Sequence, residues 1–464
     1  MIPTRKDGYK LLHDGCIALA EVEANGIRID VPRLERRIQR TGEQIKELEA
    51  KLFKSSFWKE WKTKFKNRSN MNSPVQMGSM LEASGCELDK TKTGRTKTDA
   101  VSLAKLDDPF VKDFLAKKKL EKLKSTYLTG VMREVVDGFL HPVFNLHLVS
   151  TYRSSSDSPN FQNLPIRDPE VGKIIRECFI PRDKHVLVEV DYSALEVRIS
   201  ACYNDDPTLI EYIQDPTKDM HRDMAAECYL LDQDQVTKTS RFYAKNQFVF
   251  PQFYGSYWGL CAPNLWKAID EGDLATVDGV PLKEHLSDNG VYELGSYNSD
   301  ERPKQGTFMR HIQNVEDNFW NERFPVYQQW KKDWWEQYLE TGGFDILTGF
   351  RIDGVHKRND VINYPVQGAA FHCLLWSLIQ IQKRIRKRGM KSKIVGQIHD
   401  SIIADVYLPE LQDYLNLAKQ TMTKDLLDHW DWIIVPLDVE VEVGEENWWN
   451  KKEWTSGNDV WSRK

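Results

Sequence analysis

Hydrophobic and polar residues alternate most regularly near the middle of the chain, in VLVEVDYSALEVR from Val186 to Arg198. The first five residues alternate as in a half-buried strand, which runs into Asp191. After Asp191 the pattern changes to one that can start a helix. A second segment, KIVGQIHDSIIADVY at 393–407, predicts two apolar strands around a polar tip that carries Asp400. The sequence therefore predicts two carboxylates, each at the end of a strand.

The N-terminal part of the chain has helical patterns. Residues 13–50 are predicted to be mainly helical, and the first helix is expected to stop at Asn25-Gly26 because glycine commonly ends helices. A second, heavily charged helix is predicted to begin near Asp30 and to run past Lys51. The chain therefore opens with two consecutive helices.

Later stretches also carry helical patterns, at 215–258, 307–342 and 361–389. Pro251 is expected to end or distort the helix that contains it. The last of these helices is predicted to be long and largely buried. A final strand, VPLDVEVEVG at 435–444, is expected to pair with the Asp400 hairpin in an antiparallel sheet. These elements predict the α+β class, with an antiparallel sheet and a mainly helical remainder.

The composition is that of an ordinary globular protein, with 29% charged and 41% hydrophobic residues among 464. This length is enough for roughly three domains. We find no apolar run that approaches ~20 residues and no secretion signal, so we expect no membrane contact. The seven cysteines are scattered without a C-x-x-C pair. Their pattern favours reduced thiols in a cytosol-like compartment and argues against a zinc site.

The formal net charge of −5 argues against a polyanion partner, but the charge is unevenly distributed along the chain. Residues 51–130 hold 18 Lys and Arg against 9 Asp and Glu, a local balance of +9. The basic loop 90–98 and the basic helix 114–128 lie in this stretch, and each is either a solvated face or a grip on a phosphate backbone. Segment 259–306 has 9 acidic and 4 basic residues and shows no long helical period. We interpret it as a peripheral insertion kept away from the polyanion.

Two groups of residues suggest phosphoryl chemistry. Taken alone, Asp191 is better explained as the cap of the helix that follows, but together with Asp400 it suits a pair of divalent ions on a phosphoryl group. Arg241 and Lys245 are spaced i,i+4 on a predicted helix, so they form either a triphosphate clamp or a solvated face. The polar segment 148–166 is a loop whose side chains also suit contacts to bases, sugars and phosphates: Arg153, Asn160, Gln162 and Asn163.

Five motifs in order give the chain a family resemblance. They are TYRSSSDSPNFQNLP, VDYSALEVR, RFYAKNQFVFPQFYG, NYPVQGAA and QIHDS. They resemble the primer-template segment, motif A, motif B, the N-x-P-x-Q-G-x-A segment and motif C of family A DNA polymerases. NSPVQMGSML, KTGRTKT and LEKLKSTY are similar to the family's thumb. The chain thus resembles the polymerase portion of this family from about residue 10 to residue 448.

The resemblance implies a role for each matching residue. Asp191 and Asp400 would bind two Mg²⁺ ions, for which Mn²⁺ can substitute. Lys245 would be catalytic and would bind the nucleotide triphosphate with Arg241 and His221. Glu196 would exclude a ribose 2′-hydroxyl, and Tyr254 would take the place of the templating base when the fingers are open. The implied DNA contacts are Arg153, Asn160, Gln162, Asn163, Lys124, Asn363, Gln367 and His399.

The sequence departs from the family at three places. Motif B has one extra residue. The family's spacing, counted back from Tyr254, selects Phe250 as the ring on the incoming nucleotide, whereas the helix face that carries Lys245 favours Phe248. A π-bulge would reconcile the two counts, and we choose Phe250. Ser401 stands where the family usually has Glu, which suggests that a third carboxylate is dispensable. The family's proofreading domain would precede residue 10, so we expect no 3′→5′ exonuclease here unless it was removed or a separate protein supplies it.

The resemblance implies a right-hand architecture, with a helical segment at 1–29 on the palm, a thumb at 30–140, palm at 141–200 and 361–464, and fingers at 201–360. The implied partners are primer-template DNA and dNTPs, and we expect a monomer. The acidic insertion would be the surface for a separate proofreading nuclease or replisome protein, or a passive loop. The rival functions are a single-subunit RNA polymerase, against which Glu196 argues, and a non-catalytic DNA-binding replication factor, against which the two carboxylates and Lys245 argue.

Overall fold

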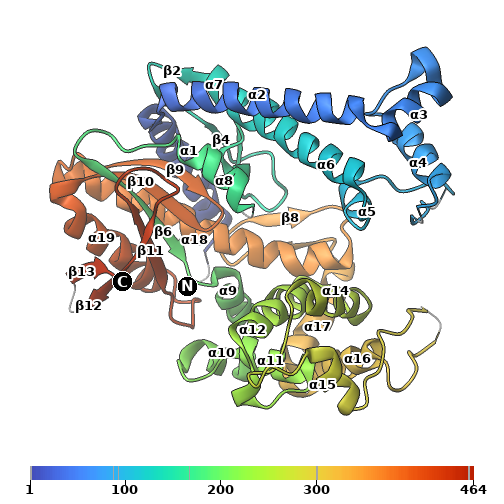
Figure 1. Cartoon of the computed structure of the whole chain (residues 1–464). Coiled ribbons are helices and arrows are strands. Elements are labelled where there is room, and N and C mark those ends of the chain that lie inside the picture. Colours follow the sequence, from blue (N-terminus) through green and yellow to red (C-terminus); the bar gives the residue numbers. More distant parts are fainter. Residues whose placement is uncertain (1–2, 87, 92, 167, 299–300, 458–459) are drawn as a thin grey trace.

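An antiparallel sheet carries two helical extensions that project to the same side of the molecule (Figure 1). The structure is a computed structural model, and it describes residues 3–86, 88–91, 93–166, 168–298, 301–457 and 460–464. Lys92 of the basic loop and residues 299–300 of the acidic segment lie outside the described residues. In the described part of the chain, no helix is both long and apolar enough to span a bilayer.

The sheet has the strand order β13-β12-β11-β6-β10-β9. Its strands are β6 His185–Tyr192, β9 Lys393–Ile398, β10 Ser401–Tyr407, β11 Val439–Gly444, β12 Lys452–Gly457 and β13 Val460–Arg463. The predicted hairpin around Asp400 is confirmed as β9 and β10. The predicted pairing of 435–444 with this hairpin is wrong, because β10 uses its second edge for β6 and β11 therefore pairs with the far edge of β6.

Side chains on β6 point to two different environments. Val190 and Tyr192 are buried, and the Tyr192 hydroxyl lies 2.9 Å from Ser377 Oγ and donates to the Met422 carbonyl at 2.7 Å. Glu189 and Asp191 alternate with them and therefore point to the opposite face of the sheet. Each buried Val or Leu of this strand stabilises the sheet by about 1.5–3 kcal/mol. The buried face thus holds Asp191 at a rigid strand end.

Helices cover the sheet and fill its core: α1 Arg5–Asn25, α8 Pro169–Arg176, α18 Arg358–Arg388, α19 Leu411–Gln420 and α20 Leu426–His429. The prediction of a long buried helix at 361–389 is confirmed by α18. The first helix packs on α18 and β9, and Asn25 Nδ2 donates to the Ile394 carbonyl at 2.9 Å. It ends at Gly26 with φ 59°, where a Cβ would lie 2.6 Å from His141 Cε1.

We call the upper extension the arm. Its helices are α2 Val31–Lys54, α3 Ser56–Phe65, α4 Pro74–Ala83, α5 Ala100–Leu103, α6 Pro109–Lys122 and α7 Thr129–Glu134. The predicted basic helix at 114–128 is α6 followed by a π-helical turn at Leu123–Leu128. Trp58 and Trp61 anchor a separate hydrophobic core at the tip of the arm. Asp30 caps α2 by accepting a hydrogen bond from the Arg33 amide at 2.9 Å.

We call the lower extension the helical lobe. Its helices are α9 Leu195–Asn204, α10 Pro207–Gln214, α11 Met220–Tyr229, α12 Lys238–Ala244, α13 Phe250–Phe253, α14 Trp258–Glu271, α15 Leu282–Asp288, α16 Phe308–Asn318 and α17 Pro325–Thr341. Short strand pairs join these parts: β1 Ile27–Arg28 and β2 Val135–Val136 with β3 Phe139–Leu140, β4 Val143–Asn145 with β5 Ser155–Asp157, and β7 Gly343–Asp345 with β8 Arg351–Asp353.

The acidic segment 259–306 is not the peripheral insertion that we expected. It contains most of α14, and Ala262 and Leu265 of this helix are fully buried in the core of the helical lobe. Leu282 and Leu286 of α15 are buried in the same core. Gly and Asn turns around these short apolar repeats obscured the helical period in the sequence. The segment is therefore a structural part of the lobe.

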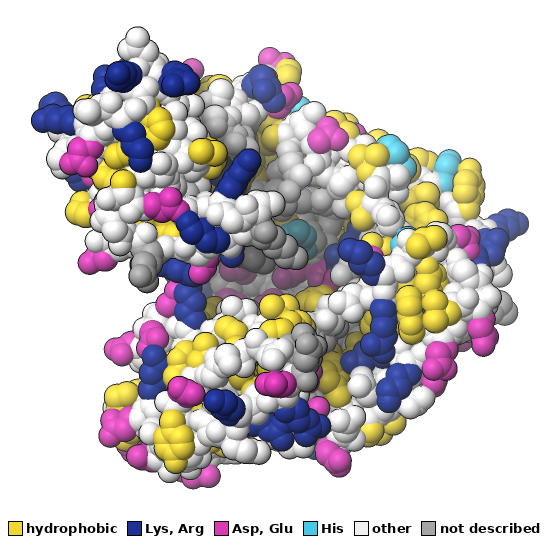
Figure 2. Space-filling model, turned by 90° about the vertical axis from the view of Figure 1, so that its right-hand side faces the viewer, with side chains coloured by type: hydrophobic (Ala, Val, Ile, Leu, Met, Phe, Trp, Pro, Cys, Tyr) yellow, Lys and Arg dark blue, Asp and Glu magenta, His cyan; other side chains and the backbone are white. Residues whose placement is uncertain are grey.

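A deep hollow separates the arm from the helical lobe, and acidic side chains and a histidine are visible on its floor (Figure 2). The arm forms the upper wall of this cleft and the lobe forms the lower wall (Figures 1 and 2). The sheet lies at the closed end, where the two extensions meet. The fold therefore presents the end of β6 and the β9–β10 turn to the space between two walls.

Candidate active site

Asp191 and Asp400 lie on neighbouring strands at one end of the sheet. Ser401 is opposite Asp191 in the register of β10 and β6, and the Tyr192 amide donates to the Asp400 carbonyl at 3.2 Å. The β9–β10 turn consists of His399 and Asp400, and His399 has φ 48°. This left-handed conformation is uncommon outside glycine but suits a two-residue hairpin turn. The tight turn thus brings the second carboxylate beside the first.

Both carboxyl groups have raised pKa values. Enclosure by protein, and then the charge of Asp400, raises the pKa of Asp191 to about 7, although part of this side chain stays open to solvent. Burial, and then the charge of Glu196, raises the pKa of Asp400 to about 6. Asp400 Oδ1 is also buried without a hydrogen-bond partner. Two crowded carboxylates with an unsatisfied oxygen are the environment that a divalent cation stabilises.

A third carboxylate that the sequence analysis missed lies beside this pair. Glu440 of β11 is opposite Asp191 on the other edge of β6, and its charge contributes to the raised pKa of Asp191. Ser193 Oγ donates to Glu440 Oε1 at 3.3 Å. Ser401, in contrast, is buried and donates to the Ile398 carbonyl. The alternating VEVEV pattern was the available signal for Glu440.

Glu196 is the centre of a hydrogen-bond network at the start of α9. Arg153 forms an ion pair with Glu196 Oε1, and Tyr254 Oη donates to Glu196 Oε2 at 2.5 Å. Partial burial of the ring, and then the Glu196 carboxylate, raise the pKa of Tyr254 above its usual range. Asn363 Nδ2 holds the backbone next to this ring by donating to the Tyr254 carbonyl at 3.1 Å. Four predicted site residues thus meet here.

A π-helical turn at Lys245–Val249 reconciles the two counts of motif B, as the sequence analysis required. Phe248 is fully buried and packs edge-on against Phe319 in the core of the lobe, with ring centroids 5.5 Å apart. Phe250 is only partly buried and lies with its ring 5.0 Å from Lys245 Nζ. The structure therefore places Phe250, and not Phe248, beside Lys245.

The other predicted triphosphate residues surround this ring. His221 of α11 meets Phe250 edge-on at 5.7 Å between centroids. Burial, together with the charges of Lys245 and Arg241, lowers the pKa of His221 to about 4, so its ring is neutral at pH 7. Arg241 Nε donates to Asp219 Oδ2 at 2.6 Å, which fixes the guanidinium on α12. Two cations and a neutral imidazole therefore share one surface of the lobe.

A small cavity links the predicted nucleotide and DNA residues. Its lining includes Glu196, Phe250, Tyr254, Asn363 and Gln367. These side chains come from α9, α13 and α18 and the residue after α13, which are far apart in the sequence. The structure thus brings together residues from three of the five motifs.

The primer-template segment has a polar network of its own. Gln162 Nε2 donates to Ser154 Oγ at 2.8 Å and to Gln397 Oε1 at 2.7 Å. Gln397 Nε2 donates to the His399 carbonyl at 2.7 Å, so the network supports the turn that carries Asp400. The sequence analysis missed Ser154 and Gln397. Gln397 is almost fully buried, and the apolar residues around it in the strand were the available signal for this burial.

Three predicted DNA contacts lie outside this network. Asn160 accepts a hydrogen bond from the Asn163 amide at 3.1 Å, and both side chains remain exposed. Lys124 lies across α2, where a Cβ at Gly42 would be 2.7 Å from Lys124 Nζ. Glycine at position 42 therefore allows the lysine to cross this helix.

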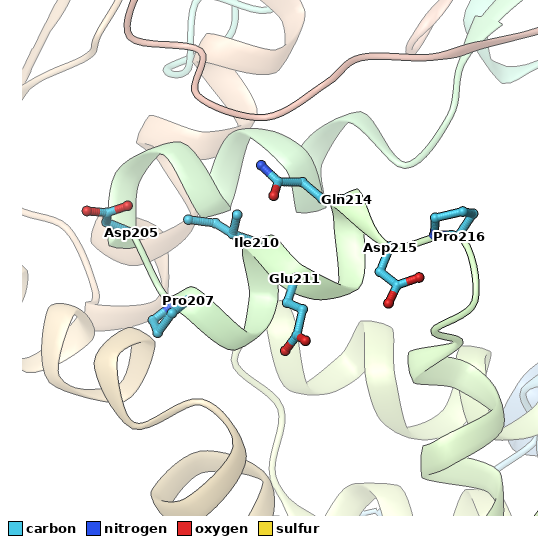
Figure 3. Close-up of a pocket in the computed structure, with 7 residues that line it drawn as sticks. All are labelled: Asp205, Pro207, Ile210, Glu211, Gln214, Asp215 and Pro216. Atoms are coloured by element: carbon cyan, nitrogen blue, oxygen red, sulfur yellow. The ribbon is translucent and has the colours of Figure 1, made fainter.

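A surface groove of ≈ 730 Å³ runs along α10, away from these residues. Figure 3 shows its lining side chains spread along the helix, with Asp205 and Asp215 at opposite ends. These two carboxylates lie apart, so they do not form one site. The chemistry of the molecule is concentrated in the cleft and not in this groove.

The family model for "DNA polymerase family A" matches residues 32–266 and 347–450. The chain belongs to DNA polymerase family A. The matched residues include both carboxylates and the π-helical turn. The family A match therefore covers the arm, the four strands β6, β9, β10 and β11, and the helical lobe as far as the first part of α14.

Relatives within family A agree with this match. The chain is 27% identical over 453 residues to the thermostable DNA polymerase I of Thermus aquaticus, covering 94% of this chain and 47% of the relative. It is 28% identical over 448 residues to DNA polymerase I of Geobacillus stearothermophilus, covering 94% and 45%. The chain thus spans about half the length of the curated relatives it matches.

A solved family A structure has the same fold. It is the POL domain of Pol1 from M. smegmatis in complex with DNA primer-template and dNTP. The TM-score is 0.70 at 25% identity, and the match covers 94% of this chain and 69% of that one. Both the sequence and the backbone are therefore similar to polymerase domains over nearly all of this chain.

Proposed function

We propose that this chain is a DNA-directed DNA polymerase that adds dNTPs to the 3′-hydroxyl of a primer on a template strand. The observation that carries the proposal is the Asp191–Asp400 pair at the end of β6 in a family A chain. The similar M. smegmatis domain is described in complex with DNA primer-template and dNTP, which supports the same partners here.

In this proposal the sheet is the palm, the arm is the thumb and the helical lobe is the fingers. A right hand of this kind encloses duplex DNA between thumb and fingers, with the primer end on the palm. The cleft between the arm and the helical lobe supports this assignment (Figures 1 and 2). The basic balance of residues 51–130 supports a thumb that faces a phosphate backbone.

Asp191 and Asp400 would hold two Mg²⁺ ions, or Mn²⁺ in their place. Mg²⁺ binds through one or two carboxylates together with substrate phosphates, so this pair and its unsatisfied oxygen fit the ion. Bound divalent ions supply charge neutralisation on the transferring phosphoryl group and lower the pKa of the primer hydroxyl. The protein's own contribution is to fix the two carboxylates beside each other, and the bound ions would favour their charged forms.

The helical lobe would bind and orient the nucleotide. Lys245 and Arg241 carry the positive charge that the triphosphate requires, and Lys245 is placed to stabilise the leaving pyrophosphate. Phe250 offers a ring face to the incoming base beside Lys245. His221 is neutral at pH 7, so it binds phosphate oxygen by hydrogen bonding and not by charge.

Glu196 and Tyr254 would select the sugar. Their hydrogen bond fixes a carboxylate and a ring at one wall of the small cavity that Phe250 also lines. A ribose 2′-hydroxyl would have to enter this filled space, whereas deoxyribose does not. The arrangement therefore favours dNTPs over rNTPs.

The direct test is primer extension by the purified chain with Mg²⁺ and separate dNTP and rNTP pools. We expect template-dependent extension with dNTPs and little with rNTPs. Preferred extension with rNTPs would identify an RNA polymerase instead. Binding of primer-template without extension in either pool would contradict the proposed activity and leave a DNA-binding factor.

A further inference from the structure

A cluster of aromatic side chains lies just beyond the proposed template position. Tyr257 and Trp258 stand at the start of α14, a few residues after Tyr254, and Tyr297 comes from the segment after α15. The ring centroids of Tyr257 and Tyr297 are 5.8 Å apart, and those of Trp258 and Tyr297 are 5.3 Å apart. Two segments of the chain therefore converge to place three rings in contact.

These rings stay at the surface in a fixed arrangement. Tyr257 is 37% exposed and Tyr297 is 46% exposed. A hydrogen bond between the two hydroxyl groups contributes to the raised pKa of Tyr257. Gly259 is buried under them, and a Cβ there would lie 2.5 Å from Tyr257 Cε2 and 2.9 Å from Tyr297 Cδ2. The absence of a side chain at Gly259 thus lets both rings lie close to the backbone of α14.

The cluster continues directly from the active-site cleft. The Gly255 carbonyl, two residues before Tyr257, accepts a hydrogen bond from Asn359 Nδ2 at 3.1 Å. Lys357 and Arg358 precede Asn359 and are exposed at the start of α18. Two exposed cations therefore lie within two residues of the contact between α18 and the Gly255 backbone.

Part of the acidic charge of segment 259–306 is paired and lies away from the rings. Asp270 and Glu271 lie at the far end of α14, where they pair with Lys283 and Lys267. The first turn of α14 carries no acidic residue. Exposed Glu301 bridges to Asn298 next to Tyr297, so the rings have an acidic neighbour on that side and none within the first turn of α14.

We propose that Tyr257, Trp258 and Tyr297 form a stacking platform for unpaired bases of the template strand before they reach the active site. Exposed aromatic rings beside cations are the usual means of holding single-stranded nucleic acid, because every base offers a face for stacking and every phosphate a negative charge. The location beyond Tyr254 makes the incoming template, and not the product duplex, the strand that reaches the rings. This inference rests on the proposed polymerase function.

The test compares the binding of two primer-templates by fluorescence anisotropy. One has a single unpaired template nucleotide, and the other has a template tail of about ten unpaired nucleotides, within the range that such sites cover. The double variant Tyr257→Ala/Tyr297→Ala should lose affinity for the long tail on the order of tenfold relative to the short one. The variant Tyr257→Phe/Tyr297→Phe keeps both rings and should retain the wild-type ratio.

Tyr292→Ala is the matched control, because Tyr292 belongs to the same segment, is 70% exposed and packs on Gly306. It should leave the affinity ratio unchanged. An equal loss for both substrates in the Ala double variant would overturn the proposal, since the rings would then act through folding. An unchanged affinity ratio in the Ala double variant would also overturn the proposal, and the exposed rings would then be assigned to contact with a protein. If wild-type protein binds both DNAs but extends neither, the polymerase function fails while the affinity ratio still tests the platform.

Discussion

Tyr254 Oη donates a hydrogen bond of 2.5 Å to Glu196 Oε2. The same carboxylate pairs with Arg153 through its other oxygen. One side chain thus ties the end of α13 to the primer-template segment. In the proposed polymerase, this contact closes the space that a ribose 2′-hydroxyl would need.

Glu196→Ala should therefore weaken the choice of sugar. We expect the ratio of rNTP to dNTP incorporation to rise roughly tenfold or more, because the pocket no longer excludes the extra hydroxyl. Single-nucleotide extension with matched rNTP and dNTP gives this ratio. Glu211→Ala, on the exposed face of α10, is the control and should leave it unchanged. An unaltered ratio in Glu196→Ala would assign sugar selection to another residue.

Asp191→Asn and Asp400→Asn should each abolish primer extension and leave primer-template affinity largely intact. Each substitution keeps the shape of the side chain and removes a charge needed to hold the metal ions. The raised pKa of both groups also means that their charge destabilises the fold at neutral pH. We therefore expect both variants to unfold at a slightly higher temperature in the presence of a chelator.

Asp183→Asn is the control for this pair, because Asp183 is highly exposed before β6 and pairs with Arg28. It should retain wild-type extension. Substantial extension by either Asp191→Asn or Asp400→Asn would contradict the assignment of the metal site.

His372 should make the protein sensitive to mild acid. It is fully buried on α18, where it stacks on Phe350 at 4.2 Å and contacts Thr348 Oγ1. Burial, and then the nearby charge of Arg153, lowers its pKa to about 3. Between about pH 6.5 and 3 the unfolded chain binds a proton that the folded chain does not. Stability should thus fall by up to about 1.4 kcal/mol per pH unit below 6.5.

Urea denaturation at several pH values between 7 and 5 measures this loss. His372→Phe removes the titrating group, so its free energy of unfolding should change less with pH than that of wild type. The comparison uses the slope against pH and is therefore independent of any packing defect in the variant. Equal slopes for the two proteins would show that other groups cause the acid sensitivity.

Gln252 should position the segment that carries Phe250 and Tyr254. It is 1% exposed; its Oε1 accepts from Trp320 Nε1 at 2.8 Å, and its Nε2 donates to Glu316 Oε2 at 2.5 Å. Gln252→Leu removes both hydrogen bonds and deprives buried Trp320 Nε1 of this acceptor, at a cost of about 1–3 kcal/mol. We expect a severalfold higher KM for dNTP with a smaller change in kcat.

Steady-state extension kinetics measure this change, with Gln329→Leu as the control. Gln329 is exposed on α17 and its side chain bonds only to Asp333 among the contacts that the described structure gives it. An unchanged KM in Gln252→Leu, together with a lower melting temperature, would show that the network stabilises the lobe without positioning α13.

Leu265→Ala tests whether the acidic segment is part of the lobe. Leu265 is fully buried in α14, so we expect a loss of about 2–5 kcal/mol in the free energy of unfolding. Val277→Ala, at a position 60% exposed in the same segment, should cost well under 1 kcal/mol. Denaturant titration compares the two. Equal, small effects would restore the view of a passive insertion.

The sequence predicted the features that local patterns determine. The alternation before Asp191 and the apolar strands around Asp400 are local, and so is the extra residue that required a π turn before Phe250. Glu440 and Gln397 were missed because their roles depend on cross-strand register and on contacts between distant segments. The helix α14 was missed because its apolar face can be recognised only from its packing in the core of the lobe.

The π-helical turn at Lys245–Val249 determines how this chain has to be aligned with its relatives. One extra residue rotates all later side chains by about 100° unless the turn absorbs it. An alignment that is anchored at Lys245 and has no gap inside this turn places Val249 at the phenylalanine position of motif B. Substitution data for that phenylalanine in relatives then transfer to the wrong residue. With a one-residue gap in the turn, Phe250 takes that position and Phe248 becomes a core residue whose loss affects folding.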